Sequence, residues 1–511
     1  MHADSYLRGE ALLSSMSDKC SVILRKLSAD TAEERAYGRF LDNPRVPFSE
    51  VLSSYRPPPP PLSGRHILIV EDTTEVSFGL EPNKKELGKI GNGHHSGFFF
   101  HPAICLDAQN GGCLGLGSAD VYVRQAYEPT EEELQLAKAS LEKSAVKAVN
   151  KILKLDKTAA HLSPVKPPTA KAIASLARER HQSHLPFEEK NRYRWLKTAT
   201  DAAQYYQEAA RKTVVTDCEG DIYQLFVGFV VQKLDFVIRT YHNRYLEHLK
   251  SESTLRTQSS EWAVQCCYKL KLPATDKRSA HEAILNVRYQ KVAIACPEQA
   301  AKDILTLPSQ PIETLVAMPE QLTLYAVRVS EDPSSVVNNE KPIDWLLLTS
   351  HEVESCEQAL EIIQFYCWRW VIEQVFRTLK SQGLNIQSSR LDDYDALTKL
   401  ALLALMAAVQ ILQLVQARDG KTEQKSDEVF DPIEIQVIEQ LNKQLEGKTA
   451  KQKNPHPPLS LAFAAWVIAR LGGWKANASP RPPGPITLFD GMVIFHNIVC
   501  GYKLNSIPMD P

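Results

Sequence analysis

The stretch that decides both the fold and the site is Phe365–Lys380, which reads FYCWRWVIEQVFRTLK. An α-helix turns by about 100° per residue, so side chains at suitable spacings share one face. On a single helix, Tyr366, Arg369, Glu373 and Lys380 would fall within a sector roughly 60° wide. An acid flanked by two cations and a phenol on one face is suited to holding a divalent metal beside phosphate oxygens.

Length and composition describe an ordinary globular protein. The 511 residues predict roughly two to four domains and are ample for a buried core. The hydrophobic content is 43% and the charged content is 23%. Because the net charge is only −2, a nucleic-acid-binding protein of this composition must segregate its cations on part of its surface.

The cysteine pattern and the apolar runs indicate a cytoplasmic location. The ten cysteines contain no C-x-x-C pair, and only Cys266 and Cys267 are adjacent. This pattern predicts reduced thiols rather than a disulfide framework or a zinc site. No secretory signal opens the chain. The longest apolar stretch, Leu400–Val409, is about half a membrane span, so we expect a buried helix there and no membrane partner.

Two predicted strands are each followed by an aspartate. His66–Val70 is nearly all apolar, as expected for a strand buried on both faces, and Asp72 comes soon after it. Thr213–Thr216 is a β-branched run, and Asp217 follows it directly. Asp221 is predicted to cap the helix that comes next.

The rest of the chain alternates between helical and β patterns. One long helix should begin at Ser355, with a capping box to Gln358, and should run to Lys380. Further strands are predicted over 98–106, 115–122, 235–240 and 345–349, and further helices over 395–418, 432–446, 459–471 and 489–501.

Residues 131–194 differ in character from their surroundings. From Leu136 to Arg194 there are 13 Lys and Arg against 5 Asp and Glu, with prolines interspersed. This composition predicts a helix, a proline-rich linker and a second helix. The segment is either a solvated helical excursion or a basic insertion that touches DNA.

Three carboxylates from distant parts of the chain suggest metal chemistry. Oxygen ligands such as those of Asp72, Asp217 and Glu373 suit hard cations such as Mg²⁺. Two ions about 3.5–4 Å apart could clamp a scissile phosphate, with Arg369 and Lys380 stabilising its extra negative charge. An aspartate at a strand end, or a charged network on a helix surface, is common without any catalysis. The combination favours the functional interpretation.

Other residues have simpler interpretations. His94, His95 and His101 lack a second pair of ligands at a spacing that suits metal, so we interpret them as a polar loop. Trp368 and Trp370 flank the central signature and are interpreted as bracing the helix against the sheet.

At these positions the chain resembles the DDE transposases of bacterial insertion sequences, in the cut-and-paste branch with the Y-x2-R-x3-E-x6-K signature. The signature is matched by Tyr366, Arg369, Glu373 and Lys380, and Asp217 rather than Asp221 takes the second catalytic position. The resemblance runs from about Glu34 to the end of the chain. Further similar segments are Ile69–Thr74 (IVEDTT), Glu86–Gly91 (ELGKIG), Val215–Tyr223 (VTDCEGDIY), Trp345–Thr349 (WLLLT), Ala464–Trp474 and Pro480–Leu488.

The resemblance implies an α/β fold: a ribonuclease-H-like core, which is a mixed sheet flanked by helices, with a β-rich insertion and helical N- and C-terminal regions. The implied regions are a short helical DNA-end-binding region (1–62), the first part of the core (63–130 and 195–254), the basic insertion (131–194), the β-rich insertion (255–344), the last core strand with the catalytic helix (345–418), and a helical dimerisation region (419–511).

The resemblance also implies a reaction. Hydrolysis nicks the transposon end, the freed 3′-hydroxyl attacks the opposite strand to give a hairpin, and the opened end is joined to target DNA. Asp72, Asp217 and Glu373 would be catalytic metal ligands, with two Mg²⁺ ions per site and Mn²⁺ as a substitute. The partners would be double-stranded DNA, both ends and target, and a second copy of the chain in a homodimer assembled on DNA.

DNA contacts are implied in the same way. Trp345 would stack on a flipped base, and the remaining residues would contact phosphates. The phosphate contacts near the flipped nucleotide are Tyr366, Arg369 and Lys380, and further ones are Arg239, Arg377 and Arg390.

Two alternatives stay open at this point. The segment before Asp72 is short for the family, which favours a catalytically idle DNA-binding or dimerising inhibitor derived from a transposase. A ribonuclease-H-like nuclease without strand transfer is the other alternative. The presence of all three carboxylates favours the active enzyme.

Overall fold

The computed structural model describes residues 3–79, 84–91, 93–124, 127–155, 167–246, 254–272, 274, 279–308, 315–337, 340–381, 383–476 and 481–505. The middle of the basic insertion and the first residue of the expected motif at Pro480 lie outside these ranges.

An eleven-stranded mixed sheet runs through the protein. Its strands follow the order β2-β4-β1-β6-β7-β13-β12-β9-β8, with β3 and β5 also paired to β4, and β10 and β11 form a separate pair. The strands are β1 His66–Glu71, β2 Thr74–Ser77, β3 Gly88–Ile90, β4 His95–Asp107, β5 Cys113–Tyr122, β6 Arg211–Thr216, β7 Asp235–Arg239, β8 Cys266–Leu272, β9 His281–Ala295, β10 Ile304–Thr306, β11 Leu315–Ala317, β12 Gln321–Glu331 and β13 Asp344–Thr349.

The centre of the sheet brings several chain segments to one edge. β1, β6 and β7 are parallel, so Asp72 and Asp217 follow the same ends of neighbouring strands, and Arg239 ends the third. β13 is antiparallel to β7, which places Trp345 at its start on that edge as well. The strands predicted at these positions are confirmed.

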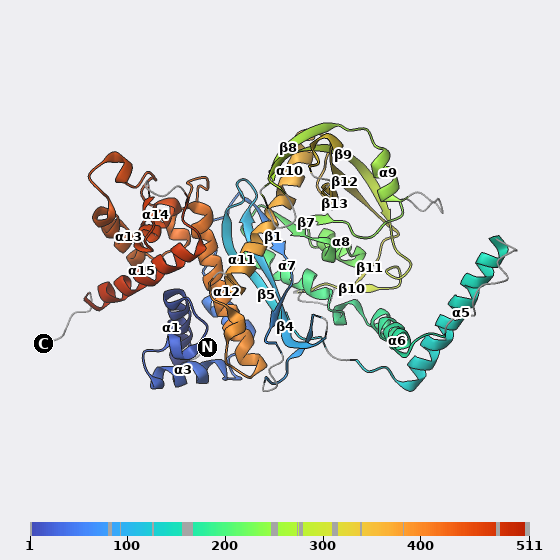
Figure 1. The fold of residues 1–511 in the computed structure, drawn as a ribbon, viewed down its shortest axis with the longest axis horizontal. Helices are drawn as coiled ribbons and strands as arrows, with labels where there is room; N and C mark the ends of the chain where they lie inside the picture. The colour runs from blue at the N-terminus through green and yellow to red at the C-terminus, as the bar shows by residue number, and fades with distance from the viewer. Residues whose placement is uncertain are drawn as a thin grey trace.

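Helices cover both faces of the sheet (Figure 1). Leu68 and Val70 of β1 belong to the core that includes α10, α11 and α12, whereas Ile67 and Ile69 belong to the core with α7 and α8. Burial on both faces explains why this strand is an unbroken apolar run. The helices are α1 Ala3–Lys19, α2 Leu24–Leu27, α3 Thr31–Leu41, α4 Phe48–Tyr55, α5 Glu131–Leu155, α6 Ala170–His184, α7 Tyr193–Tyr205, α8 Tyr223–Val231, α9 Leu255–Glu261, α10 Cys356–Trp368, α11 Trp370–Lys380, α12 Tyr394–Ala417, α13 Pro432–Leu445, α14 Leu461–Leu471 and α15 Pro485–Asn505.

The helix α12 is the centre of the helical half. Asp393 caps its start by accepting hydrogen bonds from two backbone N–H groups. By length and composition α12 could cross a membrane, but 83% of its most apolar window is buried inside the protein. The N-terminal helices α1, α3 and α4 and the C-terminal helices α14 and α15 pack against it. The helix predicted at the end of the chain is confirmed as α15.

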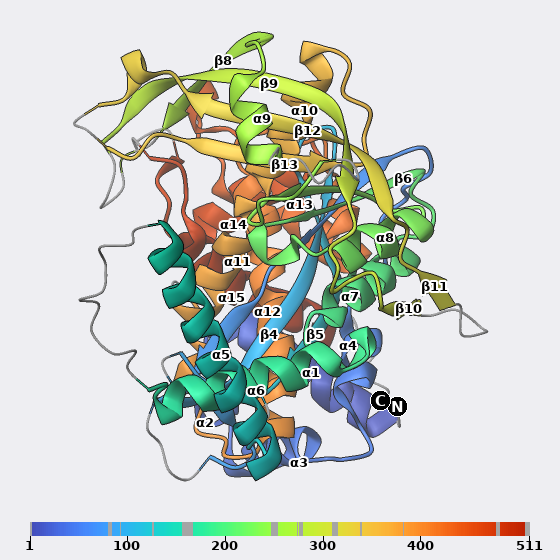
Figure 2. The same cartoon turned by 90° about the vertical axis from the view of Figure 1, so that its right-hand side faces the viewer.

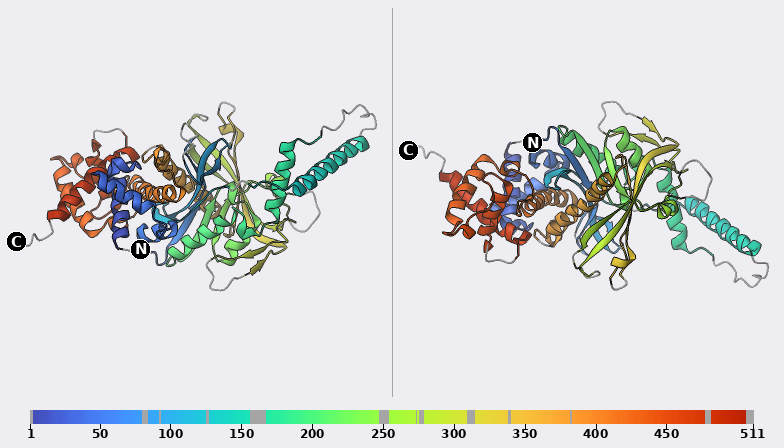
Figure 3. Two further views of the ribbon diagram at one scale, coloured as in Figure 1. Left: turned by 90° about the horizontal axis from the view of Figure 1, so that it is seen from below. Right: turned by 90° about the horizontal axis from the view of Figure 1, so that it is seen from above.

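The two expected insertions differ in their relation to the sheet. β8, β9 and β12 extend the same sheet beyond β13, as the upper part of Figure 2 shows. The helices α5 and α6 lie against each other and project from the body at the end opposite the C-terminal helices (Figure 3). The predicted region boundaries remain predictions.

One expectation about the cysteines is wrong. Cys266 in β8 and Cys356 at the start of α10 form a disulfide, with 6.2 Å between their Cα atoms. These positions are 90 residues apart in sequence, and only the pairing geometry of the fold brings them together. The cytoplasmic location was predicted partly from free thiols and remains a prediction.

Candidate active site

Asp72 is the most buried of the three predicted catalytic acids. Its Oδ1 accepts a hydrogen bond from the Thr73 backbone N–H at 2.8 Å, and its Oδ2 accepts one from Arg369 Nη1 at 2.8 Å. Burial raises the pKa of Asp72 to about 7, and the charge of Asp217 adds to this effect. Arg369 and the Thr73 N–H oppose the shift without cancelling it.

Arg369 lies at a break that the sequence pattern does not predict. The expected single helix is two helices, α10 and α11, which meet at this residue. Its N–H donates to Tyr366 O and its carbonyl accepts from Ile372, both three residues away, so the chain tightens to a 3₁₀-like turn there. The prediction of one unbroken helix is therefore wrong, although the capping box of Ser355 is confirmed. The four signature residues remain electrostatic neighbours across the break.

Glu373 and Asp217 complete the acidic group around Arg369. Glu373 Oε1 lies 3.8 Å from Arg369 Nη2. Asp217 follows β6, and its Oδ1 accepts from the Glu219 N–H at 2.7 Å. Burial alone would lower the pKa of Arg369, but the charges of Asp72, Tyr366, Asp217 and Glu373 raise it overall. Arg369 thus lies within 3.8 Å of both Asp72 and Glu373, and the charge of Asp217 acts on it as well.

The donor set suits a hard divalent cation in chemistry but not in its present arrangement. Carboxylate oxygens are the ligands that Mg²⁺ prefers. Burial, and then repulsion from Asp217, raise the pKa of Asp72, and a bound cation would favour its ionised form. Among the residues that the structure describes, however, no three His, Cys, Asp or Glu side chains are grouped closely enough to hold a metal ion. One oxygen of Asp72 is bonded to Arg369 instead. Metal binding by these residues remains a prediction.

Tyr366 and Trp345 lie together beside the acids. Their rings are 5.4 Å apart between centroids and meet edge to face. Burial raises the pKa of the Tyr366 hydroxyl, while the charges of Arg239 and Arg369 oppose the shift. Trp345 is half-buried at the start of β13. The side chains predicted to contact a flipped nucleotide are therefore neighbours.

The remaining predicted cations differ in position. Lys380 is the last residue of α11. Burial lowers the pKa of its ammonium group, while the charges of Glu75 and Glu373 oppose the shift. Lys380 therefore faces the acidic group. Arg377 and Arg390 are exposed, on α11 and in the loop that precedes α12. Their role as phosphate contacts remains a prediction.

The interpretation of His101 as part of a polar loop is wrong. His101 lies within β4 and is fully buried, with its ring 4.5 Å from that of Trp195. Its Nδ1 is 2.8 Å from the Thr73 hydroxyl and its Nε2 is 3.6 Å from Glu71 Oε1. Burial lowers the pKa of His101 to about 3 and raises that of Glu71 well above its usual value.

Sequence reasoning missed three acids at the site. Glu71 is the last residue of β1, Glu75 lies in β2, and Glu219 follows Asp217 in the next loop. Burial is the largest cause of the raised pKa of Glu219, and the charges of Asp217 and Glu75 raise it further. A signal for Glu71 existed, because it continues a strand whose other positions are nearly all apolar.

The two tryptophans of the signature have different environments. Trp368 stacks on Phe365 of the same helix, with 6.1 Å between ring centroids, so its bracing of the helix against the sheet stays a prediction. Trp370 is 54% exposed, so the same interpretation is wrong for this residue. Arg369 lies over its ring at 5.5 Å from the centroid. An exposed aromatic ring therefore borders the acidic group.

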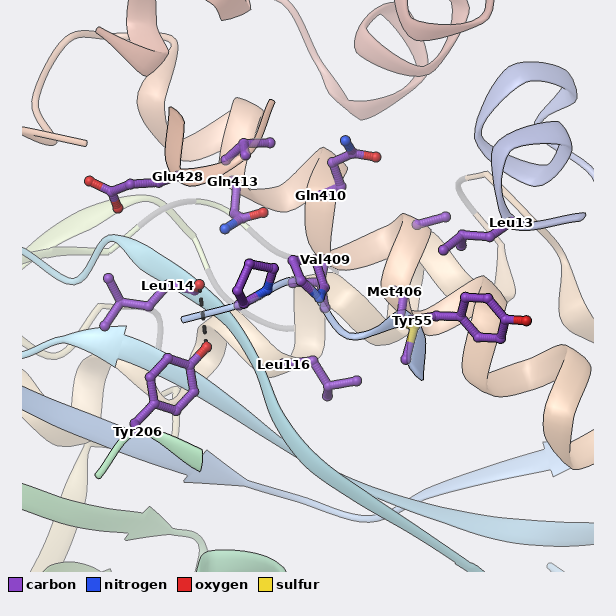
Figure 4. Close-up of a pocket in the computed structure, with 15 residues that line it drawn as sticks. Leu13, Tyr55, Leu114, Leu116, Tyr206, Met406, Val409, Gln410, Gln413 and Glu428 are labelled. Carbon is purple, nitrogen blue, oxygen red and sulfur yellow. Dashed lines mark hydrogen bonds between the residues drawn. The ribbon is translucent and has the colours of Figure 1, made fainter. Parts of the chain in front are cut away.

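A separate cavity of about 140 Å³ lies between β5, the start of the proline run and α12 (Figure 4). Tyr206 donates to Leu114 O on its wall, and Glu428 and Gln413 also line it. None of the three predicted catalytic acids is part of this wall. The cavity is a packing gap between the sheet and the helical half.

Comparison with known proteins identifies a family for this chain. A cryo-EM structure of the piggyBac transposase synaptic complex with hairpin DNA aligns over 100% of this chain and 74% of that chain, at 7% identity. Its TM-score of 0.34 is too low to establish a common fold. The family model described as a transposase DDE domain matches residues 153–410, just over half of the 511 residues, and includes Asp217 and Glu373. The chain therefore belongs to the transposase DDE domain family.

Proposed function

We propose that this protein is a metal-dependent DNA transposase that nicks transposon ends, forms a hairpin by attack of the freed 3′-hydroxyl, and joins the opened end to target DNA. Membership of the transposase family supports DNA transposition in general. The observation that carries the finer proposal is that Asp72 and Glu373 both lie within 3.8 Å of Arg369, while Asp217 follows the neighbouring strand at the same edge and its charge adds to the raised pKa of Asp72.

The fold supports a ribonuclease-H-like core. β4 pairs antiparallel with β1, while β1, β6 and β7 are parallel, and helices cover both faces. In such an open sheet, ligands bind outside the carboxyl ends of the parallel strands. Asp72 and Asp217 both lie at that end, and α11 supplies Glu373 from one face.

Asp72, Asp217 and Glu373 are the residues that would hold two Mg²⁺ ions, or Mn²⁺ in their place. When bound, such ions activate the attacking hydroxyl and stabilise the leaving oxygen. Arg369 has to leave Asp72 for this arrangement, because it occupies the Oδ2 atom. Once displaced, its guanidinium is free to donate two hydrogen bonds to a phosphate.

DNA would lie across the cations that border the acids. Lys380 and Arg239 contact phosphates on either side, and Arg377 and Arg390 extend this track on the exposed surface. Trp345 stacks on a flipped base and offsets an unstacking cost of roughly a few kcal/mol. We propose that the active form is a homodimer assembled on DNA, in which each copy binds one end.

A plasmid assay tests the proposal. A supercoiled plasmid carrying the inverted repeats that flank the gene is incubated with the protein and Mg²⁺ or Mn²⁺, with Glu373→Ala as the control. Excision with hairpin intermediates, lost in the variant, supports the proposal. Binding without cleavage identifies an idle inhibitor and contradicts it. Nicking without joining identifies a nuclease and contradicts strand transfer.

A further inference from the structure

A series of buried polar groups lies directly behind the acids. The Thr73 N–H donates to Asp72 Oδ1 at 2.8 Å, and the Thr73 hydroxyl is 2.8 Å from His101 Nδ1. On the far side of the imidazole, His101 Nε2 is 3.6 Å from Glu71 Oε1. Glu71 and His101 are both 0% exposed. Glu71, His101 and Thr73 therefore form a series of neighbouring polar groups inside the core, and this series ends at Asp72.

This arrangement costs folding free energy. Both carboxyl oxygens of Glu71 and Nε2 of His101 are buried and have no hydrogen-bond partner among the residues that the structure describes. A buried polar group without a partner costs its full desolvation penalty, and apolar residues of similar volume in its place are often neutral or stabilising. Buried unsatisfied groups in a native structure call for an explanation other than packing.

We propose that His101 is a positioning residue for Asp72 and acts through Thr73. This inference rests on the proposed function. Asp72 has two fixed contacts, and one of them, Arg369, is the contact that is released when a cation binds. The other is the Thr73 N–H. Because His101 anchors the Thr73 side chain, it fixes the backbone that supplies this remaining contact.

The environment of His101 suits such a role. The ring is held edge to face by Trp195 at 4.5 Å, so its orientation is set by packing as well as by the hydrogen bond. Groups that orient a metal ligand without touching the metal typically contribute 10–100-fold in metal affinity or activity. Loss of the hydrogen bond between His101 and Thr73 removes no metal ligand and no DNA-binding cation. The affinity for DNA should therefore be unaffected.

The test uses two disruptive variants, His101→Leu and Thr73→Val, and two conservative ones, His101→Asn and Thr73→Ser. Mn²⁺ binding is measured by electron paramagnetic resonance without DNA, and kcat and KM are measured on end DNA. We expect the disruptive variants to raise the Kd for Mn²⁺ by 10–100-fold and to lower kcat with KM unchanged. The conservative variants should recover most of both losses, because they restore a hydrogen-bonding group at the same place.

His351 and Thr213 provide a matched control. The His351 Nε2 atom lies 2.8 Å from the Thr213 hydroxyl, and both residues are buried. Thr213 lies within β6, four residues before Asp217. His351→Leu and Thr213→Val should lower the thermal stability and leave the Kd for Mn²⁺ unchanged. Equal weakening of Mn²⁺ binding by this pair would overturn the inference.

The remaining outcomes separate the inference from the proposed function. If the unmodified protein neither binds Mn²⁺ nor cuts DNA, the proposed function fails and the inference fails with it. If it does both, and folded His101→Leu and Thr73→Val behave identically to it, only the inference is overturned. Should His101→Leu fail to fold, Thr73→Val alone decides, because it keeps the shape of the side chain.

Discussion

Arg369 Nη1 lies 2.8 Å from Asp72 Oδ2, although the two residues are 297 positions apart in sequence. Both side chains are largely buried, and the same guanidinium reaches Glu373 at 3.8 Å. A side-chain cation therefore occupies the middle of an acidic group that we propose to be a metal site. The pair compensates the buried negative charge as long as no metal ion is present.

Removing this cation should destabilise the protein. Breaking a buried ion pair by deleting one partner typically costs about 3–5 kcal/mol, because the other charge is left uncompensated. We expect Arg369→Ala to lower the free energy of unfolding by about 3 kcal/mol at pH 8. Urea unfolding measures this change in the free energy of unfolding. The control is Arg390→Ala at an exposed position, for which the expected change is within about 0.5 kcal/mol. Equal, small effects at both positions would contradict a structural role for the Arg369 pair.

The contribution of Asp72 to the stability should fall as the pH rises from about 4 to about 7. The folded-state pKa of Asp72 is raised from 3.8 to about 7, so the folded protein binds more protons than the unfolded chain between these values. At about 1.36 kcal/mol per pKa unit, this group disfavours folding by up to about 4 kcal/mol above pH 7. Urea unfolding in EDTA should show that Asp72→Asn gains stability relative to the unmodified protein at pH 8 but not at pH 4. A pH-independent difference between the two proteins would count against the raised pKa.

Trp345 should matter for DNA and little for folding. Stacking of a base on an aromatic side chain contributes about 1–3 kcal/mol per base. Trp345→Ala should therefore weaken binding to a cleaved transposon end by roughly 5–150-fold, measured by fluorescence anisotropy. The matched control is a transposon end with an abasic site at the flipped position. The variant and the unmodified protein should bind this DNA with the same Kd. A loss that persists on the abasic end would exclude stacking on that base.

Much of the framework was predictable from local pattern. The strand beginning at His66 and the β-branched run at Thr213 are buried on both faces, and such strands leave an apolar signature that needs no tertiary information. The two aspartates that follow them were located for the same reason. The helix at Tyr394 was found because its apolar run is a local feature.

The features that could not be predicted depend on tertiary contacts. The break at Arg369 leaves the helical periodicity unchanged, so it has no sequence signature. His101 is a polar residue at a buried position, where composition favours a solvated interpretation. The partner of Cys266 is 90 residues away, and cysteine spacing alone does not identify it.

The central claim is that Glu373 serves the chemistry and the surrounding cations hold the DNA. The most direct measurement compares Glu373→Ala with the unmodified protein in cleavage of a transposon end and in affinity for the same DNA. Because phosphate contacts by Lys and Arg dominate affinity, we predict that the variant loses cleavage while its Kd for DNA stays within about threefold of the unmodified protein. Cleavage that survives the substitution, or a parallel loss of cleavage and DNA binding, would contradict the account.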